Sequence, residues 1–329
     1  MTINNKIIRI LAAGMLLLTA CKKDFQKINT DPSNPQTVTP GAMLGQLEYR
    51  FVNASITAAK SFNHELMQVT APQISPSGGI HRYQIDPDVN GGIWGGFYAL
   101  MADVKDLNTM SGRLGENNYK AIALVYKSWA FSILTDVFGD VPYSEAAEAA
   151  AGIVQPKFDK QKDIYTGILK DLDSANNLFD SSKALTYAGD YLYNANTVTS
   201  GKNPGIIKWK KFGNSLRLRI LLRISKRDGE LPVNQQISNI LGDPGKYPIF
   251  ASTDDDAIFA YPGTYPFYNP YYNARALDWR QQDYYTMFFI DKMNKDADPR
   301  RAIWATRVKV NNVDTFQGIQ SGYKVMLPM

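Results

Sequence analysis

Hydrophobic residues recur at every third or fourth position along much of the chain, and this spacing predicts α-helices. Polar residues, glycine and proline interrupt the pattern at 72–92 and 186–204, where we expect irregular loops. A short connection between 119–138 and 158–179 predicts that these two helices pack as an antiparallel pair. The expected helices cover the following ranges: 43–69, 94–107, 119–138, 158–179 and 205–226.

The stretch 119–138 carries one broad apolar stripe. Gly139 tolerates the left-handed backbone that ends helices, and Pro142 prevents the helix from resuming at once. We therefore expect a buried helix followed by a rigid exit loop, in which Asp140 and Glu145 have no catalytic partner. The residues of the stripe are Ile122, Val125, Tyr126, Trp129, Ala130, Ile133, Leu134 and Val137.

Two further helices have recognisable details. Asp159 stands where the N-cap of the helix at 158–179 is expected, because its carboxylate can accept a hydrogen bond from a free backbone N–H. The helix at 205–226 has a basic face, which we interpret as solvated with a few arginines paired to carboxylates. Its predicted inner stripe is Trp209, Phe212, Leu216, Ile220 and Ile224.

The last hundred residues change in character. Asp254, Asp255 and Asp256 precede a strand-like run at 257–261, and three carboxylates raise a weak hypothesis of a calcium site. One more helix is expected to follow and to end before Asp298. Its apolar positions are Trp279, Tyr284, Tyr285, Phe288, Phe289 and Met293.

The segment 261–273 holds six aromatic residues and three prolines, so it cannot form a helix. Irregular backbone of this kind displays side chains, and binding residues concentrate on such loops. Aromatic rings offer flat faces to sugar rings, although the same rings can simply pack against the scaffold. The ligand-binding candidates here and just beyond are Tyr265, Phe267, Tyr268, Tyr271, Tyr272 and Trp279.

A second group of candidates lies near the start of the helix at 94–107. Trp94 and Tyr98 are four residues apart at a loop-to-helix junction, with Tyr83 in the preceding loop. They are ligand-binding candidates, and the alternative is that Trp94 and Tyr98 belong to the core. His64 lacks a second histidine four residues later, so we interpret it as an ordinary partly buried residue and not as a zinc ligand.

The N-terminus has the pattern of a bacterial lipoprotein signal. Lys6 and Arg9 precede about eleven mostly apolar residues, too few to span a bilayer. The sequence Leu-Thr-Ala-Cys then ends at Cys21, the only cysteine in the chain, which we expect to be lipidated. The predicted organisation is a signal peptide at 1–20, a lipidated tether at 21–42 and a helical domain at 43–329.

Composition narrows the function only slightly. The chain is 44% hydrophobic and 20% charged, as in ordinary globular proteins, and its formal charge of +5 is too small to argue for nucleic acid binding. A single cysteine excludes an intramolecular disulfide or a metal site built on several cysteines. No catalytic motif is recognisable, so we expect neither catalytic residues nor a cofactor.

Three motifs resemble the SusD/RagB family, in particular its SusD-like outer-membrane lipoproteins. The first is Phe-Gly-Asp-Val-Pro-Tyr-Ser-Glu-Ala at 138–146, which follows a helix with Trp and Ala facing inward. The second is Trp-x-x-Phe-x-Asn-Ser-Leu-Arg-Leu-Arg at 209–219, and the third is Asp-Pro-Arg at 298–300. The resemblance covers nearly all of this chain.

The resemblance implies an all-α fold, with a scaffold of tetratricopeptide-like helix pairs and long irregular loops rich in aromatic residues. It also implies a non-catalytic lipoprotein at the outer membrane, facing the cell exterior, that binds oligosaccharide and delivers it to a SusC-like TonB-dependent transporter. Peptide binding of the RagB type is an alternative, and a surface glycoside hydrolase is another. Because such proteins normally continue further, we also expect the C-terminus to be truncated.

Overall fold

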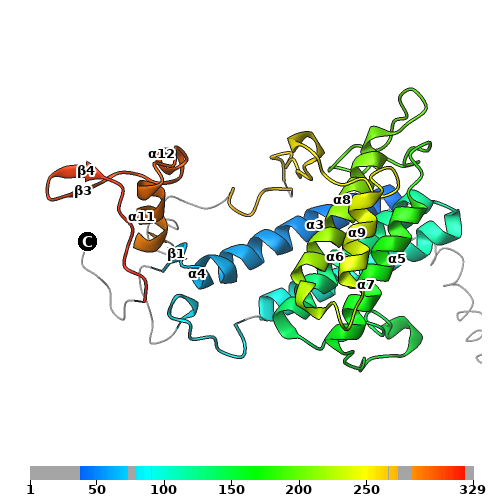
Figure 1. Cartoon of the computed structure of the whole chain (residues 1–329), viewed down its shortest axis with the longest axis horizontal. Coiled ribbons are helices and arrows are strands. Elements are labelled where there is room, and N and C mark those ends of the chain that lie inside the picture. Colours follow the sequence, from blue (N-terminus) through cyan, green and yellow to red (C-terminus); the bar gives the residue numbers. More distant parts are fainter. Residues whose placement is uncertain (1–37, 73–78, 90, 266, 273–283, 323–329) are drawn as a thin grey trace, which may run out of the picture. The chain divides into compact units, whose positions relative to one another are not determined.

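The structure is a computed structural model that describes residues 38–72, 79–89, 91–265, 267–272 and 284–322. Figure 1 shows that helices dominate this part of the chain. The α-helices are α3 (Pro40–Ala58), α4 (His64–Leu66), α5 (Gly91–Leu114), α6 (Asn117–Phe138), α7 (Gln161–Leu178), α8 (Pro204–Arg223), α9 (Val233–Gly242), α11 (Met287–Lys295) and α12 (Arg301–Trp304). The shorter elements are the π-helix η1 (Ala59–Asn63), the 3-10 helices η2 (Ile80–Arg82), η3 (Ala149–Ala151), η4 (Ser225–Arg227) and η5 (Thr253–Asp255), and the strands β1 (Thr70–Ala71), β2 (Tyr284–Tyr285), β3 (Val308–Val310) and β4 (Val313–Thr315).

The first predicted helix is present as α3, which continues through the π-helix η1 into α4. Its buried face packs on α5, where the rings of Phe51 and Phe97 lie 5.4 Å apart between centroids. Arg50 forms an ion pair with Asp103 on the same pair of helices. Residues later in α3 contact residues earlier in α5, so the two helices are antiparallel.

Helix α6 forms the centre of the scaffold and contacts α5, α7 and α8. Gly115, at φ 72°, adopts the left-handed geometry of the tight turn between α5 and α6. By length and composition α6 could cross a membrane, but 61% of its apolar window is buried inside the protein. Tyr119, Ile122, Val125 and Leu134 are completely buried, so α6 is a core helix.

The remaining scaffold helices also pack as antiparallel neighbours. Arg217 on α8 donates hydrogen bonds to Asp173 on α7 at 2.6 Å and to Gln236 on α9 at 2.9 Å. Helix α8 begins where the Asn203 side chain accepts a hydrogen bond from the backbone N–H of Ile206 at 3.0 Å. The five predicted inner residues, which lie on α8 and at its C-cap, are all buried. The predicted all-α fold with helix pairs is confirmed.

A buried pair of carboxyl groups holds the irregular loop between α7 and α8 against α3. Asp190 accepts hydrogen bonds from the backbone N–H of Ala195 at 2.9 Å and from the Trp209 indole at 3.0 Å. Glu48 on α3 is fully buried and accepts one from the backbone N–H of Tyr191 at 2.8 Å. Burial raises the pKa of Glu48 well above its ordinary value, and the neighbouring Asp190 raises it further.

Two short antiparallel pairings complete the described chain. Strand β1 pairs with β2, placing Thr70 opposite Tyr285, and β3 pairs with β4 as a hairpin. The hairpin turns at Asn311 and Asn312, which have φ values of 50° and 66°. Asparagine tolerates this left-handed geometry, which a two-residue turn with both central residues at positive φ requires.

Four local predictions are wrong. Asp159 does not cap α7, because its carboxylate accepts hydrogen bonds from the backbone N–H groups of Tyr143 and Ser144 at 2.9 and 2.7 Å. The run 257–261 forms no strand, since it pairs with no neighbouring backbone. The last predicted helix begins only at Met287, because Tyr284 and Tyr285 form β2 instead. The connection 139–160 is also longer than expected, although α6 and α7 do pack together.

Candidate functional site

An aromatic pocket of about 470 Å³ opens between the end of the first helical segment and the C-terminal elements. This volume lies within the range of small-molecule sites. Three aromatic rings come from β2, α11 and α12, and a fourth comes from the irregular aromatic segment. The lining residues are Lys60, His64, Val69, Thr70, Tyr271, Tyr285, Phe289 and Trp304.

Thr286 fixes the wall of the aromatic pocket. It is completely buried, and its hydroxyl donates to the backbone carbonyl of Gln68 while accepting from the backbone N–H of Phe289 at 3.3 Å. Its own backbone N–H donates to the Val69 carbonyl at 3.1 Å. Thr286 therefore joins the pairing of β1 with β2 to the N-terminus of α11, and so positions the two lining aromatics on either side of it.

The aromatic side chains of the pocket are arranged in a row. The rings of Tyr285 and Phe289 lie 5.3 Å apart, and those of Phe289 and Trp304 lie 6.4 Å apart and nearly parallel at 12°. Burial raises the pKa of Tyr285, so its hydroxyl is neutral at physiological pH and can donate or accept a hydrogen bond. The Lys60 ammonium lies 5.7 Å from the ring centroid of Tyr271.

This arrangement suits a neutral ligand with flat apolar faces and polar edges. Stacked rings can cover the C–H faces of a sugar, while the tyrosine hydroxyls, Thr70 and His64 can bind hydroxyl groups. Among the described lining residues there is no carboxylate. The described lining residues therefore offer stacking faces and hydrogen-bonding groups to such a ligand.

Of the predicted ligand-binding residues, Tyr271 lines the pocket. Its neighbours Tyr268 and Tyr272 stack on each other, with ring centroids 4.3 Å apart and the planes inclined by 1°. Tyr272 is 63% exposed and Tyr265 is 85% exposed. The predicted aromatic segment thus contributes one side chain to the pocket and displays others on the surface.

Phe267 packs on the scaffold and does not line the pocket. Its ring meets that of Tyr49 on α3 edge to face, with centroids 5.1 Å apart, and the Tyr49 hydroxyl donates to the backbone carbonyl of Tyr268 at 3.3 Å. Tyr261 donates to the Asn53 side chain at 2.7 Å on the same helix. These contacts hold the aromatic segment along α3.

Trp94 and Tyr98 lie elsewhere and take part in packing. Trp94 is half-buried among Tyr98, Phe138 and Phe158, with ring centroids 4.6, 5.1 and 6.2 Å away. The Tyr98 hydroxyl donates to the Pro142 carbonyl at 2.7 Å and so holds the exit loop of α6. Tyr83 is 65% exposed at φ 59° after η2. None of the three lines the aromatic pocket.

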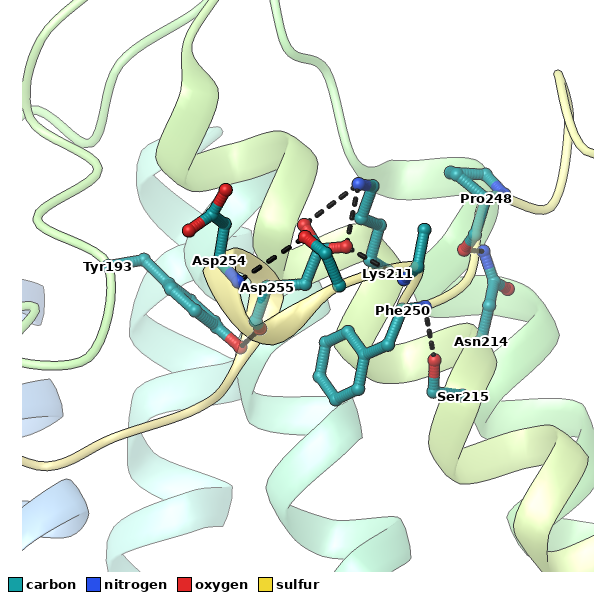
Figure 2. Close-up of polar contacts among 10 residues, drawn as sticks. Tyr193, Lys211, Asn214, Ser215, Pro248, Phe250, Asp254 and Asp255 are labelled. Carbon is teal, nitrogen blue, oxygen red and sulfur yellow. Dashed lines mark hydrogen bonds and ion pairs between the residues drawn. The ribbon is translucent and has the colours of Figure 1, made fainter.

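In the acidic run at 254–256, the Asp255 side chain is engaged in an ion pair. Asp255 accepts hydrogen bonds from the Lys211 ammonium at 2.8 and 2.9 Å, and this pairing lowers the pKa of its carboxyl (Figure 2). Figure 2 shows the Asp254 carboxylate outside this ion pair. Within the described ranges no group of three or more His, Cys, Asp or Glu residues could hold a metal ion. The calcium hypothesis therefore has no geometric basis at these residues.

Two predicted sites, Cys21 and Trp279, lie outside the described residues. Seven of the eight residues that line the pocket were not among the predicted candidates: Lys60, His64, Val69, Thr70, Tyr285, Phe289 and Trp304. Tyr285 and Phe289 had been assigned to the apolar face of a helix, and His64 to ordinary partial burial. The pairing of β1 with β2, more than two hundred residues apart in the chain, brings Tyr285 close to the segment that follows His64.

A family model described as "Starch-binding associating with outer membrane", the SusD-like family, matches residues 32–327. A comparison with curated proteins gave no match.

Solved structures of SusD homologues share this fold at low sequence identity. One from Bacteroides fragilis is 23% identical with a TM-score of 0.65, covering 84% of this chain and 54% of its own. One from Bacteroides thetaiotaomicron is 18% identical with a TM-score of 0.62, covering 88% and 57%. A chitin-binding homologue from Flavobacterium johnsoniae is 17% identical with a TM-score of 0.64, covering 86% and 58%.

The chain therefore spans a little over half the length of these solved structures. The family model covers nearly all of the chain, and the motifs at 138–146 and 209–219 lie on α6, its exit loop and α8, the helices that build the core. On this evidence the chain belongs to the SusD-like family.

Proposed function

We propose that the protein is a surface lipoprotein that binds oligosaccharide in the aromatic pocket and delivers it to a SusC-like TonB-dependent transporter. The observation that carries the proposal is the row of Tyr285, Phe289 and Trp304 along a pocket of ligand size. The family description supports starch or a related glycan and an association with the outer membrane. The chitin-binding relative supports a polysaccharide ligand.

The proposed mode of binding is stacking with hydroxyl hydrogen bonds, and no chemical step is required. Lipidation at Cys21 would hold the protein at the membrane, because two or more acyl chains give stable anchoring at about 0.8 kcal/mol per buried CH₂ group. We propose that this anchor faces the cell exterior, so that captured ligand reaches the transporter before it diffuses away.

Calorimetry of the purified full-length chain with maltooligosaccharides and chitooligosaccharides tests the proposal. Trp304→Ala should weaken binding at least about tenfold, equivalent to about 1.4 kcal/mol, because a stacking face is removed. The matched control is Ile303→Ala, since Ile303 is 81% exposed on the same short helix and does not line the pocket. Equal affinity of both variants would refute the assignment of the pocket.

A second pair of variants repeats the test on α11. Phe289→Ala removes the central ring of the row, whereas Phe288→Ala removes a neighbouring ring that is 65% exposed and outside the pocket. We expect only Phe289→Ala to lose glycan affinity. Steady release of reducing ends by the wild-type protein would instead establish a hydrolase, and tighter binding of peptides than of glycans would establish the peptide-binding alternative.

A further inference from the structure

A second cavity, of about 560 Å³, lies where the end of α6, the start of α7 and the end of α8 meet. It shares no lining residue with the aromatic pocket. Its character also differs, because charged side chains surround it. The charged lining residues are Asp136, Lys162, Arg223, Lys226, Arg227 and Glu230.

Positive charge exceeds negative charge around this cavity, with four cations against two carboxylates. Asp136 is held by the Arg223 side chain and by the Tyr165 hydroxyl. Glu230 accepts a hydrogen bond from Arg227 at 3.0 Å and lies 4.0 Å from the Lys162 ammonium. Both carboxylates are thus already neutralised by partners within the cavity wall.

Donors remain for a ligand after these pairs are formed. Arg223 contacts Asp136 through Nε and also interacts with the Tyr165 side chain, and Arg227 contacts Glu230 through Nη1. Each guanidinium carries five N–H donors, more than these contacts use. Lys226 has no carboxylate within ion-pair distance in the part of the chain that the structure describes. Guanidinium groups bind planar or tetrahedral oxyanions well, because their N–H donors are fixed in a fork.

Part of the cavity wall is apolar. Tyr165, Ile224 and Leu231 also line the cavity and contribute apolar groups to its wall. A bare inorganic anion would leave these groups uncovered, whereas an anion carried on a ring could place its apolar face there and its charge among the cations. From this combination we infer that the cavity binds a ring-bearing organic oxyanion, such as a uronic acid or a sulfated sugar.

Calorimetry of the full-length chain at low ionic strength tests this inference with glucuronate, glucose sulfate, glucose and inorganic sulfate. We expect glucuronate or glucose sulfate to bind, with affinity that falls as salt is added because the charges are exposed to solvent. The two anionic sugars separate a carboxylate source from a sulfate source. Binding of glucose as tight as that of both anionic sugars, or displacement of them by inorganic sulfate at equal affinity, would overturn the inference.

Substitutions of lysine residues test whether the anionic sugar binds in this cavity. Lys226→Gln should weaken binding of the anionic sugar about two- to fivefold, and Lys162→Gln with Lys226→Gln about tenfold, as expected for exposed charges. Lys170→Gln on the exposed face of α7 is the matched control and should change nothing. Equal loss in the control and the test variants would refute the site. Phe289→Ala should leave this binding intact, so the outcome is independent of the proposed glycan pocket.

Discussion

The helical scaffold and the C-terminal aromatic pocket use large aromatic residues in opposite ways. In the scaffold, Trp209 is completely buried and meets Tyr126 edge to face, with ring centroids 5.8 Å apart. In the pocket, Trp304 is 46% exposed and stacks on Phe289 beside an open cavity. The same residue types therefore stabilise the fold in one region and line an open pocket in the other.

The two tryptophans differ in exposure because different kinds of contact, local or distant in the sequence, determine their positions. Trp209 occupies one face of a twenty-residue helix, and helical periodicity fixes its burial. Trp304 lies at the end of a four-residue helix, and its ring lies nearly parallel to that of Phe289 on α11. Regular spacing builds the scaffold, and a few long-range contacts assemble the site on it.

The largest expected effect on stability distinguishes Trp209 from Trp304. Trp209→Ala should lower the free energy of unfolding by about 3–5 kcal/mol, because it creates a cavity and removes the indole donor from Asp190. Trp304→Ala should lower it by less than about 1.5 kcal/mol while abolishing glycan binding. Urea unfolding followed by circular dichroism measures both. If Trp209→Ala does not fold, Trp209→Phe should show an intermediate loss of unfolding free energy. Equal stability of Trp209→Ala and Trp304→Ala would contradict the proposed difference between the two regions.

The next prediction is a pH dependence of stability that arises from the buried carboxyl of Glu48. Its pKa is raised in the folded state, so its contribution to stability is fully present below its ordinary value of 4.5 and is lost as the pH rises through the folded pKa. The groups facing it are Asp190 and the Tyr126 phenol, whose pKa is itself raised by burial. The free energy of unfolding should therefore fall by up to about 1.4 kcal/mol per pH unit within that window.

Glu48→Gln is the matched variant for this prediction. It keeps the shape and a hydrogen-bond donor but cannot ionise, so its unfolding free energy should stay flat where that of the wild type falls. Urea unfolding at several pH values between about 4.5 and 8 makes the measurement. Parallel profiles for the two proteins would show that Glu48 is not the titrating group. Aspartates with lowered pKa, such as Asp255, act only at lower pH and with the opposite sign.

A smaller effect is expected at Thr286, which links the two regions. Thr286→Val keeps the volume but removes the hydroxyl that bonds Gln68 and caps α11. The loss of a cap and a buried hydrogen bond should cost about 1–3 kcal/mol and weaken glycan binding by loosening the wall of the pocket. Thr264→Val at an exposed position is the control. Normal glycan affinity in Thr286→Val would show that the pocket does not depend on this residue.

The sequence predicted the scaffold well because burial of periodic helices is a local property. The stripe on α8 and the end of α6 at Gly139 both follow from spacing and backbone freedom within one segment. Asp159 was misassigned because a carboxylate near a helix start can equally bind another loop, and here it binds the exit loop of α6. The strand predicted at 257–261 failed because β-propensity without a partner strand does not make a sheet.

The pocket could be predicted only in part. Tyr271 was identified from the density of aromatic residues in an irregular segment, which is a local signal. His64 and Trp304 carry no such signal, because each is unremarkable until β1 pairs with β2. Trp94 and Tyr98 also had a local signal, with core packing as the alternative, and contacts with Phe138 and Pro142 place them in packing.

The smallest effect on stability is expected at Tyr272, and it sharpens the boundary of the site. Tyr272 is exposed and stacks only on Tyr268 among the described aromatic contacts, so Tyr272→Ala should change the free energy of unfolding by less than about 0.5 kcal/mol. Tyr271→Ala removes the adjacent ring that lines the pocket and should weaken glycan binding several-fold more. If both variants lose the same affinity for long oligosaccharides but only Tyr271→Ala loses it for short ones, the binding surface extends from the pocket over the stacked tyrosines. Equal affinity of the two variants for every chain length would remove Tyr271 from the site.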